Sequence, residues 1–198
     1  YAHIYGLDEK TGLEISEYKS DIATMYPVMA AIGQSDNDIT TVALSRYVTA
    51  VASGKKYNYQ LMDRIVDASG KTVKKYKADY EDISDTLTDS QWDALHSGMR
   101  QVVSTMDRFQ GFDIPVAGKT GTAQQTGHAN HGLFIGYAPY DDPEITIAVR
   151  IANGYSSHNA ATAARNVISY YYKETSMKDI KEMKAAGVNG NTRNSVAD

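Results

Sequence analysis

The sequence predicts one α+β domain of the α/β sandwich type, in which an antiparallel sheet meander packs against helices. Three segments carry apolar residues at helical spacing, and three consecutive segments between residues 112 and 152 have the composition and turns of strands. The 198 residues, 42% apolar and 22% charged, are enough for one buried core and have an ordinary globular composition. The apolar runs are too short to span a bilayer.

Residues 38–53 are predicted to form the first core-facing helix, because their apolar side chains recur at mainly helical spacing and Gly54 follows the segment. The apolar positions are Val42, Leu44, Tyr47, Val48 and Val51. Farther along, residues 60–67 and 72–76 flank the glycine-containing turn at residues 68–71. This pattern is typical of a surface β-hairpin.

The second helix is predicted to begin at Thr88, which has the spacing of a capping box with Gln91. Its apolar stripe consists of Trp92, Leu95, Met99, Val102, Val103 and Met106. A three-stranded antiparallel meander follows, with strands expected in residues 112–125, in residues 132–139 and after the turn at residues 141–143. In the third strand one face is expected to carry Ile145, Ile147, Val149 and Ile151.

A last helix is predicted from a cap at Asn159 to about residue 173, packed on the meander. Its buried side is expected to contain Ala160, Ala164, Val167, Ile168 and Tyr171. Polar residues dominate after that helix, so residues 1–175 are assigned to the domain and residues 176–198 to a polar, mobile tail.

Charge and composition exclude several kinds of protein. The net charge of −4, with acidic and basic residues interspersed, argues against a nucleic-acid partner. The absence of cysteine excludes a disulfide scaffold, a thiolate metal site and a cysteine nucleophile. His128 and His131 are expected in a loop with no third ligand evident, so no metal site is predicted. No cofactor is predicted either.

The sharpest local pattern is Lys119-Thr120-Gly121, inside an extended segment that runs from Val116 to Gln124. A phosphate-binding P-loop needs a glycine at the position of Asp113 and a helix after the motif, and the sequence indicates neither. The motif instead resembles the Lys-Thr-Gly strand of penicillin-recognising serine acyltransferases. A lysine ammonium beside threonine hydroxyls can bind a carboxylate, and glycine lets a ligand backbone approach the strand.

The resemblance extends to class B penicillin-binding proteins, in order, from Gly6 to about residue 173. Four segments carry it: Gly6-Leu7-Asp8 with Thr11-Gly12-Leu13-Glu14, Ala31-Ile32-Gly33-Gln34 with Leu44-Ser45-Arg46-Tyr47-Val48, Ala117 to Gln124, and Gly136-Tyr137-Ala138-Pro139 with Pro143. The chain is therefore identified as similar to the C-terminal part of a transpeptidase domain.

This resemblance implies a parent enzyme at the extracytoplasmic face of the bacterial membrane, anchored by an N-terminal transmembrane helix that is absent from these residues. The parent would cross-link peptidoglycan through an acyl-serine formed with D-Ala-D-Ala stem peptides, would be trapped by β-lactams, and would work with other cell-wall synthesis proteins. The catalytic residues implied are Lys119, Thr120 and Gly121, and the substrate-binding residues are Thr120, Thr122, Ala123 and Gln124. The backbone N–H of Thr122 could help to stabilise an oxyanion.

Two other matches to the family's motifs, Ser16-Glu17-Tyr18-Lys19 and Ser35-Asp36-Asn37, are interpreted as accidental. A nucleophilic serine should begin a buried helix that places its lysine one turn away, whereas Pro27 follows Ser16 too soon for such a helix. The nucleophile, its lysine and the Ser-x-Asn motif are expected upstream of Tyr1, in the missing part of the same domain. The alternative hypothesis is a non-catalytic β-lactam sensor or peptidoglycan-binding module on the same fold.

Overall fold

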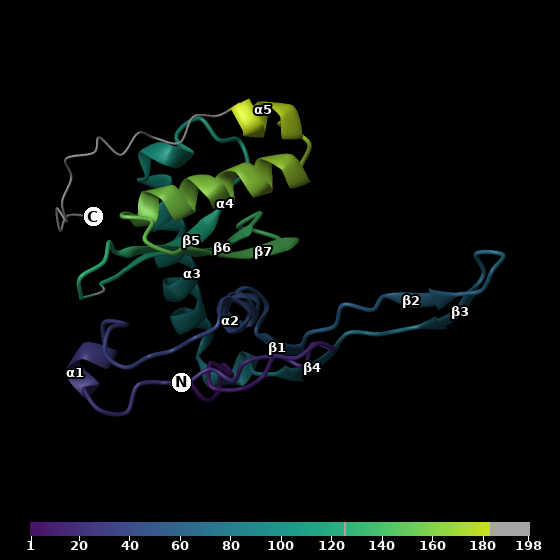
Figure 1. The fold of residues 1–198 in the computed structure, drawn as a ribbon, viewed down its shortest axis with the longest axis horizontal. Coiled ribbons are helices and arrows are strands. Elements are labelled where there is room, and N and C mark those ends of the chain that lie inside the picture. The colour runs from purple at the N-terminus through teal and green to yellow at the C-terminus, as the bar shows by residue number, and fades with distance from the viewer. Residues whose placement is uncertain (125, 183–198) are drawn as a thin grey trace.

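The computed structural model describes residues 1–124 and 126–182, and its body has three layers (Figure 1). The middle layer is an antiparallel sheet in the order β5-β6-β7. Its strands are β5 (Ala117–Ala123), β6 (His131–Ala138) and β7 (Ile145–Ile151). Helix α4 (Ser157–Tyr171) covers one face and helix α2 (Thr41–Ser53) covers the other. The predicted α+β class and three-stranded meander are confirmed.

The core beneath α4 forms because small helix residues let the helix lie close to the sheet. Ala160, Ala161 and Ala164 are fully buried against Phe134 and its neighbours. The apolar alternation of β7 is confirmed, since its four predicted residues pack against this same core. A strand that alternates apolar and polar residues thus presents its apolar side to α4.

Two expectations about α4 are wrong. The helix is capped by Ser156, whose Oγ accepts a hydrogen bond from the His158 N–H at 3.2 Å, and not by Asn159. Asn159 lies inside the helix and donates to the Gly154 carbonyl at 2.9 Å. Val167 and Tyr171 are about half exposed, at 48% and 50%, because they lie near Ile145 at the β7 edge of the sheet instead of over its centre.

Helix α3 (Asp89–Ser104) joins the two cores. Its predicted capping box is present, with the Thr88 N–H donating to Gln91 Oε1 at 2.9 Å. Met99 packs in the core on the α2 side, whereas Val103 packs in the core on the α4 side. The helix therefore crosses the sheet where β5 begins, as its single apolar stripe requires.

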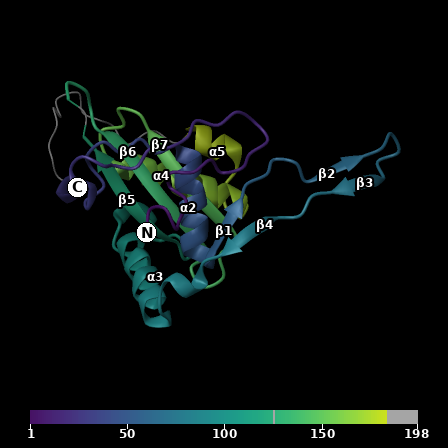
Figure 2. The ribbon, with the colours of Figure 1, turned by 90° about the horizontal axis from the view of Figure 1, so that it is seen from below.

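A long hairpin arm extends from the body (Figures 1 and 2). Its stem is the antiparallel pair of β1 (Lys55–Asn58) and β4 (Asp79–Asp82). Its outer part is the predicted hairpin, formed by β2 (Arg64–Val66) and β3 (Thr72–Lys75). The turn is closed by Asp67, whose carboxylate accepts hydrogen bonds from the Ser69 and Lys71 N–H groups. The hairpin prediction is confirmed, and the stem was not predicted.

The remaining short elements are helices α1 (Pro27–Ala30) and α5 (Met177–Glu182) and the 3₁₀ turns η1 (Ser84–Thr86) and η2 (Asp107–Phe109). Helix α5 lies in the segment predicted to be a polar tail, whose residues 183–198 are outside the described residues. Across the described ranges, no helix is long and apolar enough to cross a membrane.

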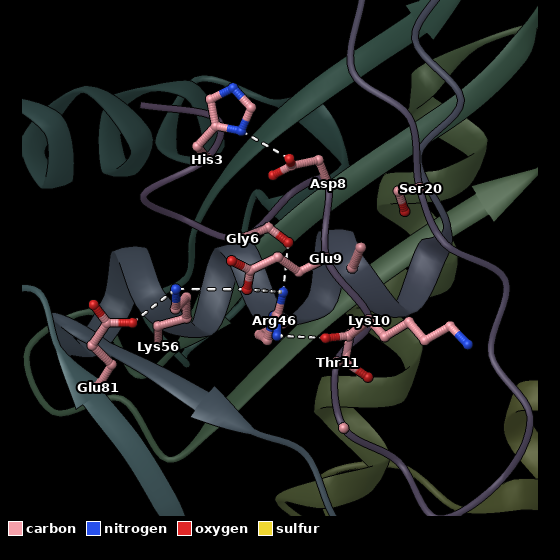
Figure 3. A network of polar contacts seen from close by, with 12 residues as sticks. His3, Gly6, Asp8, Glu9, Lys10, Thr11, Ser20, Arg46, Lys56 and Glu81 are labelled. Atoms are coloured by element: carbon pink, nitrogen blue, oxygen red, sulfur yellow. Dashed lines mark hydrogen bonds and ion pairs between the residues drawn. The ribbon is translucent and has the colours of Figure 1, made fainter.

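The first ten residues are held to α2 by a buried arginine (Figure 3). Arg46 is 1% exposed and donates to the carbonyls of Gly6 and Lys10, while its Nη2 lies 3.4 Å from Glu9 Oε2. Lys56 extends the network, because its Nζ lies 2.8 Å from Glu81 and 3.6 Å from Glu9. A buried charge is tolerable when hydrogen bonds satisfy it, and here two backbone carbonyls accept from Nη1 and Nη2. Among the described residues the buried Nε has no hydrogen-bond partner.

Gly6 provides a test of this packing. It has φ +70°, and a Cβ added there would come within 2.4 Å of Arg46 Nη2, whereas Gly70 has φ +83° and open space around it. We expect Gly6→Ala to lower the free energy of unfolding by about 2–4 kcal/mol, because the guanidinium is displaced. Gly70→Ala should cost only about 1–2 kcal/mol of backbone strain. Urea denaturation checks both, and equal losses would contradict the importance of the Arg46 network.

Candidate functional site

The candidate site is the outer edge of β5. Within the described residues β6 is the strand that pairs with β5, so the other edge of β5 has no strand beside it. Helix α3 packs beside β5, and where the strand begins Arg100 Nη1 donates to the Val116 carbonyl at 3.1 Å. Residues 119–123 continue beyond that contact and are exposed or half-buried. The structure therefore forms the strand on which the sequence placed the site.

Two glycines in β5 have different structural roles. A Cβ at Gly118 would lie 2.5 Å from the Phe134 ring and 2.7 Å from the Ile135 carbonyl, so the close packing of β5 on β6 requires glycine there. A Cβ at Gly121 would meet only Leu133, at an ordinary contact distance of 3.5 Å. The fold itself therefore tolerates a methyl group at Gly121.

The side chains of the site leave β5 on opposite faces of the sheet. Lys119 pairs with Ile135 and lies on the α2 face, whereas Thr120 and Thr122 lie on the α4 face by strand alternation. The exposed ammonium of Lys119 nevertheless bends to the edge, where Nζ donates to the Thr120 carbonyl at 2.7 Å. The Lys119 ammonium therefore lies at the open edge of the strand that carries the Thr120 and Thr122 hydroxyls. Gln124, just beyond β5, is exposed.

A residue to which the sequence assigned no role reaches this edge. Gln34 Nε2 donates to the Thr122 carbonyl at 3.3 Å, so the loop after α1 lies beside β5. Because alternate carbonyls of a strand point the same way, Thr120 and Thr122 present their carbonyls along the same edge. Gln34 had appeared only as part of the Gly-Gln resemblance, and a contact across 88 positions leaves no local sequence signal.

The Ser35-Asp36-Asn37 sequence holds that loop together. Ser35 Oγ donates to Asp36 at 2.6 Å, and Asn37 accepts from the Ala23 N–H at 2.8 Å and donates to the Gln34 carbonyl. Hydrogen bonds from Ser35 and the Thr24 N–H lower the pKa of Asp36. These polar groups are engaged in local structure, and Gln34 beside them links the loop to β5.

The segment from Ser16 to Lys19 belongs to no helix or strand, and both of these residues are exposed. Between them, the Glu17 carboxylate accepts hydrogen bonds from the Thr11 hydroxyl and from the N–H groups of residues 11–13. Burial raises the pKa of Glu17, but these hydrogen bonds outweigh it and the pKa is lowered. The segment lacks the helix that would place a serine and a lysine on one face.

At the far end of the site, His131 opens β6 opposite Ala123. Its ring is buried: Nδ1 accepts from the Asn153 N–H at 3.0 Å, and Arg150 Nη2 lies 2.8 Å from Nε2. Burial, followed by the charges of Arg150 and His128, lowers the pKa of His131. Residues 1–124 and 126–182 contain no cluster of three side chains suited to a metal ion.

The chain matches a protein-family model, the penicillin binding protein transpeptidase domain, over residues 1–169. Among curated proteins it is similar to the peptidoglycan D,D-transpeptidase MrdA of Haemophilus influenzae. The two are 27% identical over 208 residues, which cover 86% of this chain and 32% of the relative.

Solved structures show the same fold. Penicillin-binding protein 2B from Streptococcus pneumoniae matches with a TM-score of 0.74 at 23% identity, over 89% of this chain and 32% of that protein. An imipenem acyl-enzyme complex of penicillin-binding protein A from Mycobacterium tuberculosis matches with a TM-score of 0.73 at 22% identity, over 86% of this chain and 40% of that one. The chain thus spans less than half the length of each of these proteins.

The two glycines of β5 can be separated by experiment. Gly118→Ala should lower the free energy of unfolding of the 198-residue chain by about 1–3 kcal/mol, because the added methyl group overpacks the sheet. Gly121→Ala should change it by less than about 1 kcal/mol, since its surroundings can accept a methyl group. Chemical denaturation measures both. A large loss at Gly121 would show that the fold itself requires that glycine.

Proposed function

Because this chain belongs to the penicillin-binding protein transpeptidase family, we propose that it supplies the substrate-binding strand of a peptidoglycan D,D-transpeptidase. The observation that carries the proposal is the open edge of β5, with the Lys119 ammonium bent onto it and Gly121 free of close internal contacts. An extended peptide can add to such an edge through main-chain hydrogen bonds. A D-Ala-D-Ala stem peptide, or a β-lactam that imitates it, is the proposed ligand.

In this proposal the ligand displaces two side chains from the edge. Lys119 Nζ leaves the Thr120 carbonyl and Gln34 Nε2 leaves the Thr122 carbonyl. Each contact is a single hydrogen bond at a partly solvated site, with a net contribution of about 1 kcal/mol, so several new main-chain hydrogen bonds can offset their loss. Released from Thr120, the ammonium is available to the ligand and to the acylated serine.

The reaction proposed is acyl transfer in two steps. A serine oxygen attacks the carbonyl carbon between the two D-alanines, and the terminal D-alanine leaves with the proton that the serine loses. An amine of a neighbouring peptide then attacks the ester, and the serine recovers its proton. Lys119 lowers the energy of the negative charge that develops, Thr120 and Thr122 bind the ligand carboxylate, and residues 121–124 pair with its backbone.

We propose that the acylated serine lies outside these 198 residues, in a longer protein at the extracytoplasmic face of the membrane. The exposed, irregular segment around Ser16 and the locally bonded Ser35 support this proposal, because neither serine has a lysine held one helical turn away. The match to MrdA of Haemophilus influenzae covers only 32% of that relative, which supports the proposal of a longer protein.

The 198-residue chain alone should form no covalent adduct with penicillin. A serine hydroxyl without a positioned base is a weak nucleophile at neutral pH, so binding to the edge of β5 would leave no label after denaturation. Intact-mass spectrometry after long incubation with excess penicillin is the measurement. Stoichiometric acylation, mapped by peptide sequencing to Ser16 or Ser35, would contradict the proposed division of the site.

In the longer protein, Lys119→Ala should slow acylation by penicillin by about tenfold to a hundredfold, the range expected for one charge-assisted hydrogen bond made in the transition state. Lys19→Ala is the matched control, because Lys19 is an exposed lysine in an irregular segment, and it should leave the rate unchanged. Stopped-flow or quench measurements of acylation give both rates. Equal losses would show that the role assigned to Lys119 is wrong.

A further inference from the structure

The charges of the hairpin arm change character between its stem and its outer part. In the stem each lysine faces a carboxylate, since Lys55 pairs with Asp82 and Lys56 lies 2.8 Å from Glu81. In the outer part Arg64 lies directly opposite Lys75 in the register. Like charges opposite each other destabilise a two-stranded pair, and an isolated hairpin is only marginally stable.

The outer part, residues 60–77, has an excess of positive charge. It contains five basic and two acidic residues, so its formal charge is +3 in a chain whose total is −4. Both carboxylates are engaged locally: Asp63 lies 3.6 Å from Arg64, and Asp67 closes the turn. Among the described residues, no carboxylate lies within ion-pair distance of Lys71, Lys74, Lys75 or Lys77.

Apolar side chains are exposed among these cations, on both faces of the hairpin. The register places Ile65 beside Lys74 on one face, and Arg64, Lys75 and Val66 on the other. The most exposed apolar residues are Leu61 and Val73, at 62% and 68%. A surface for insertion into a membrane separates its apolar face from its basic face, and this hairpin mixes the two.

We propose that the outer arm, residues 60–77, binds the carboxylate-bearing glycan-peptide polymer of the cell wall at a place separate from β5. This inference rests on the proposed function, which makes peptidoglycan the substrate. The lysines pair with stem-peptide carboxylates, and the exposed aliphatic side chains contact the apolar faces of sugar rings. Because the arm projects away from the sheet, a polymer held there leaves the edge of β5 uncovered (Figures 1 and 2).

The test is co-sedimentation of the 198-residue chain with purified peptidoglycan from which phosphate-containing polymers have been removed. One variant carries Lys71→Gln, Lys74→Gln, Lys75→Gln and Lys77→Gln. Its matched control carries Lys10→Gln, Lys19→Gln, Lys178→Gln and Lys181→Gln, which removes the same charge from exposed positions outside the arm. Circular dichroism verifies that both variants keep the fold.

The arm variant should bind at least about tenfold more weakly than the unmodified chain, and the control should stay within about threefold. Binding should also weaken when the peptidoglycan carboxylates are amidated. It should weaken further from about 0.01 M to about 0.15 M salt, as the Debye length falls from about 30 Å to about 8 Å.

Equal losses in the two variants would show that only net charge matters and would overturn the proposal. Undiminished binding to amidated peptidoglycan, or the absence of binding by the unmodified chain, would also overturn it. Arm-dependent binding to phosphatidylglycerol vesicles that is as tight as binding to peptidoglycan would identify a lipid surface instead. Failure of the proposed function itself is recognised separately, because the longer protein would then not be acylated by penicillin.

Discussion

The buried guanidinium of Arg46 is the interaction on which the arrangement around the site depends. It lies on α2, the helix that covers one face of the sheet, and it donates to two backbone carbonyls of the first ten residues. Leaving those carbonyls and the guanidinium unpaired inside the protein would be costly, so the N-terminal segment has one favourable path along α2. That path leads through the Asp21–Asp38 bridge to the loop that carries Gln34 to β5.

The route from Arg46 to β5 is built mainly from hydrogen bonds between side chains and backbone. Glu17 holds the turn at residues 11–13, Asn37 and Asp36 hold residues 23–25, and Thr40 caps α2. Such bonds are local substitutes for secondary structure. They leave no apolar period in the sequence, which explains why the three-stranded sheet, α2, α3 and the outer hairpin were predicted correctly while the first forty residues were described only by resemblance.

The same distinction applies within the site. An extended segment was predicted over residues 112–125, and residues 117–123 of it form β5. The site was placed on this strand by the Lys119-Thr120-Gly121 motif together with the resemblance along the rest of the chain. The contact of Gln34 with Thr122 and the capping of α4 by Ser156 depend on where distant segments come together, so neither could be read from spacing. The sequence also could not distinguish the two glycines of β5. Packing against β6 requires glycine at position 118, whereas the fold would accept a methyl group at position 121.

The edge of β5 and the outer arm are both less favourable for stability than they could be. An edge strand such as β5, which has a strand on one side only, risks pairing with another chain, and lysine side chains are a common way to prevent this. Lys119 and Gln34 donate to the Thr120 and Thr122 carbonyls at this edge through hydrogen bonds that a ligand can replace. A further strand of the sheet in the same place would block the ligand. In the outer arm Arg64 lies opposite Lys75, whereas in the stem of the same hairpin lysines lie opposite carboxylates. Binding sites are expected where a local feature lowers stability in a fold that is otherwise consistent with its sequence. Here the open edge of β5 and the like-charged pair of the outer arm are two such features, on separate parts of the molecule.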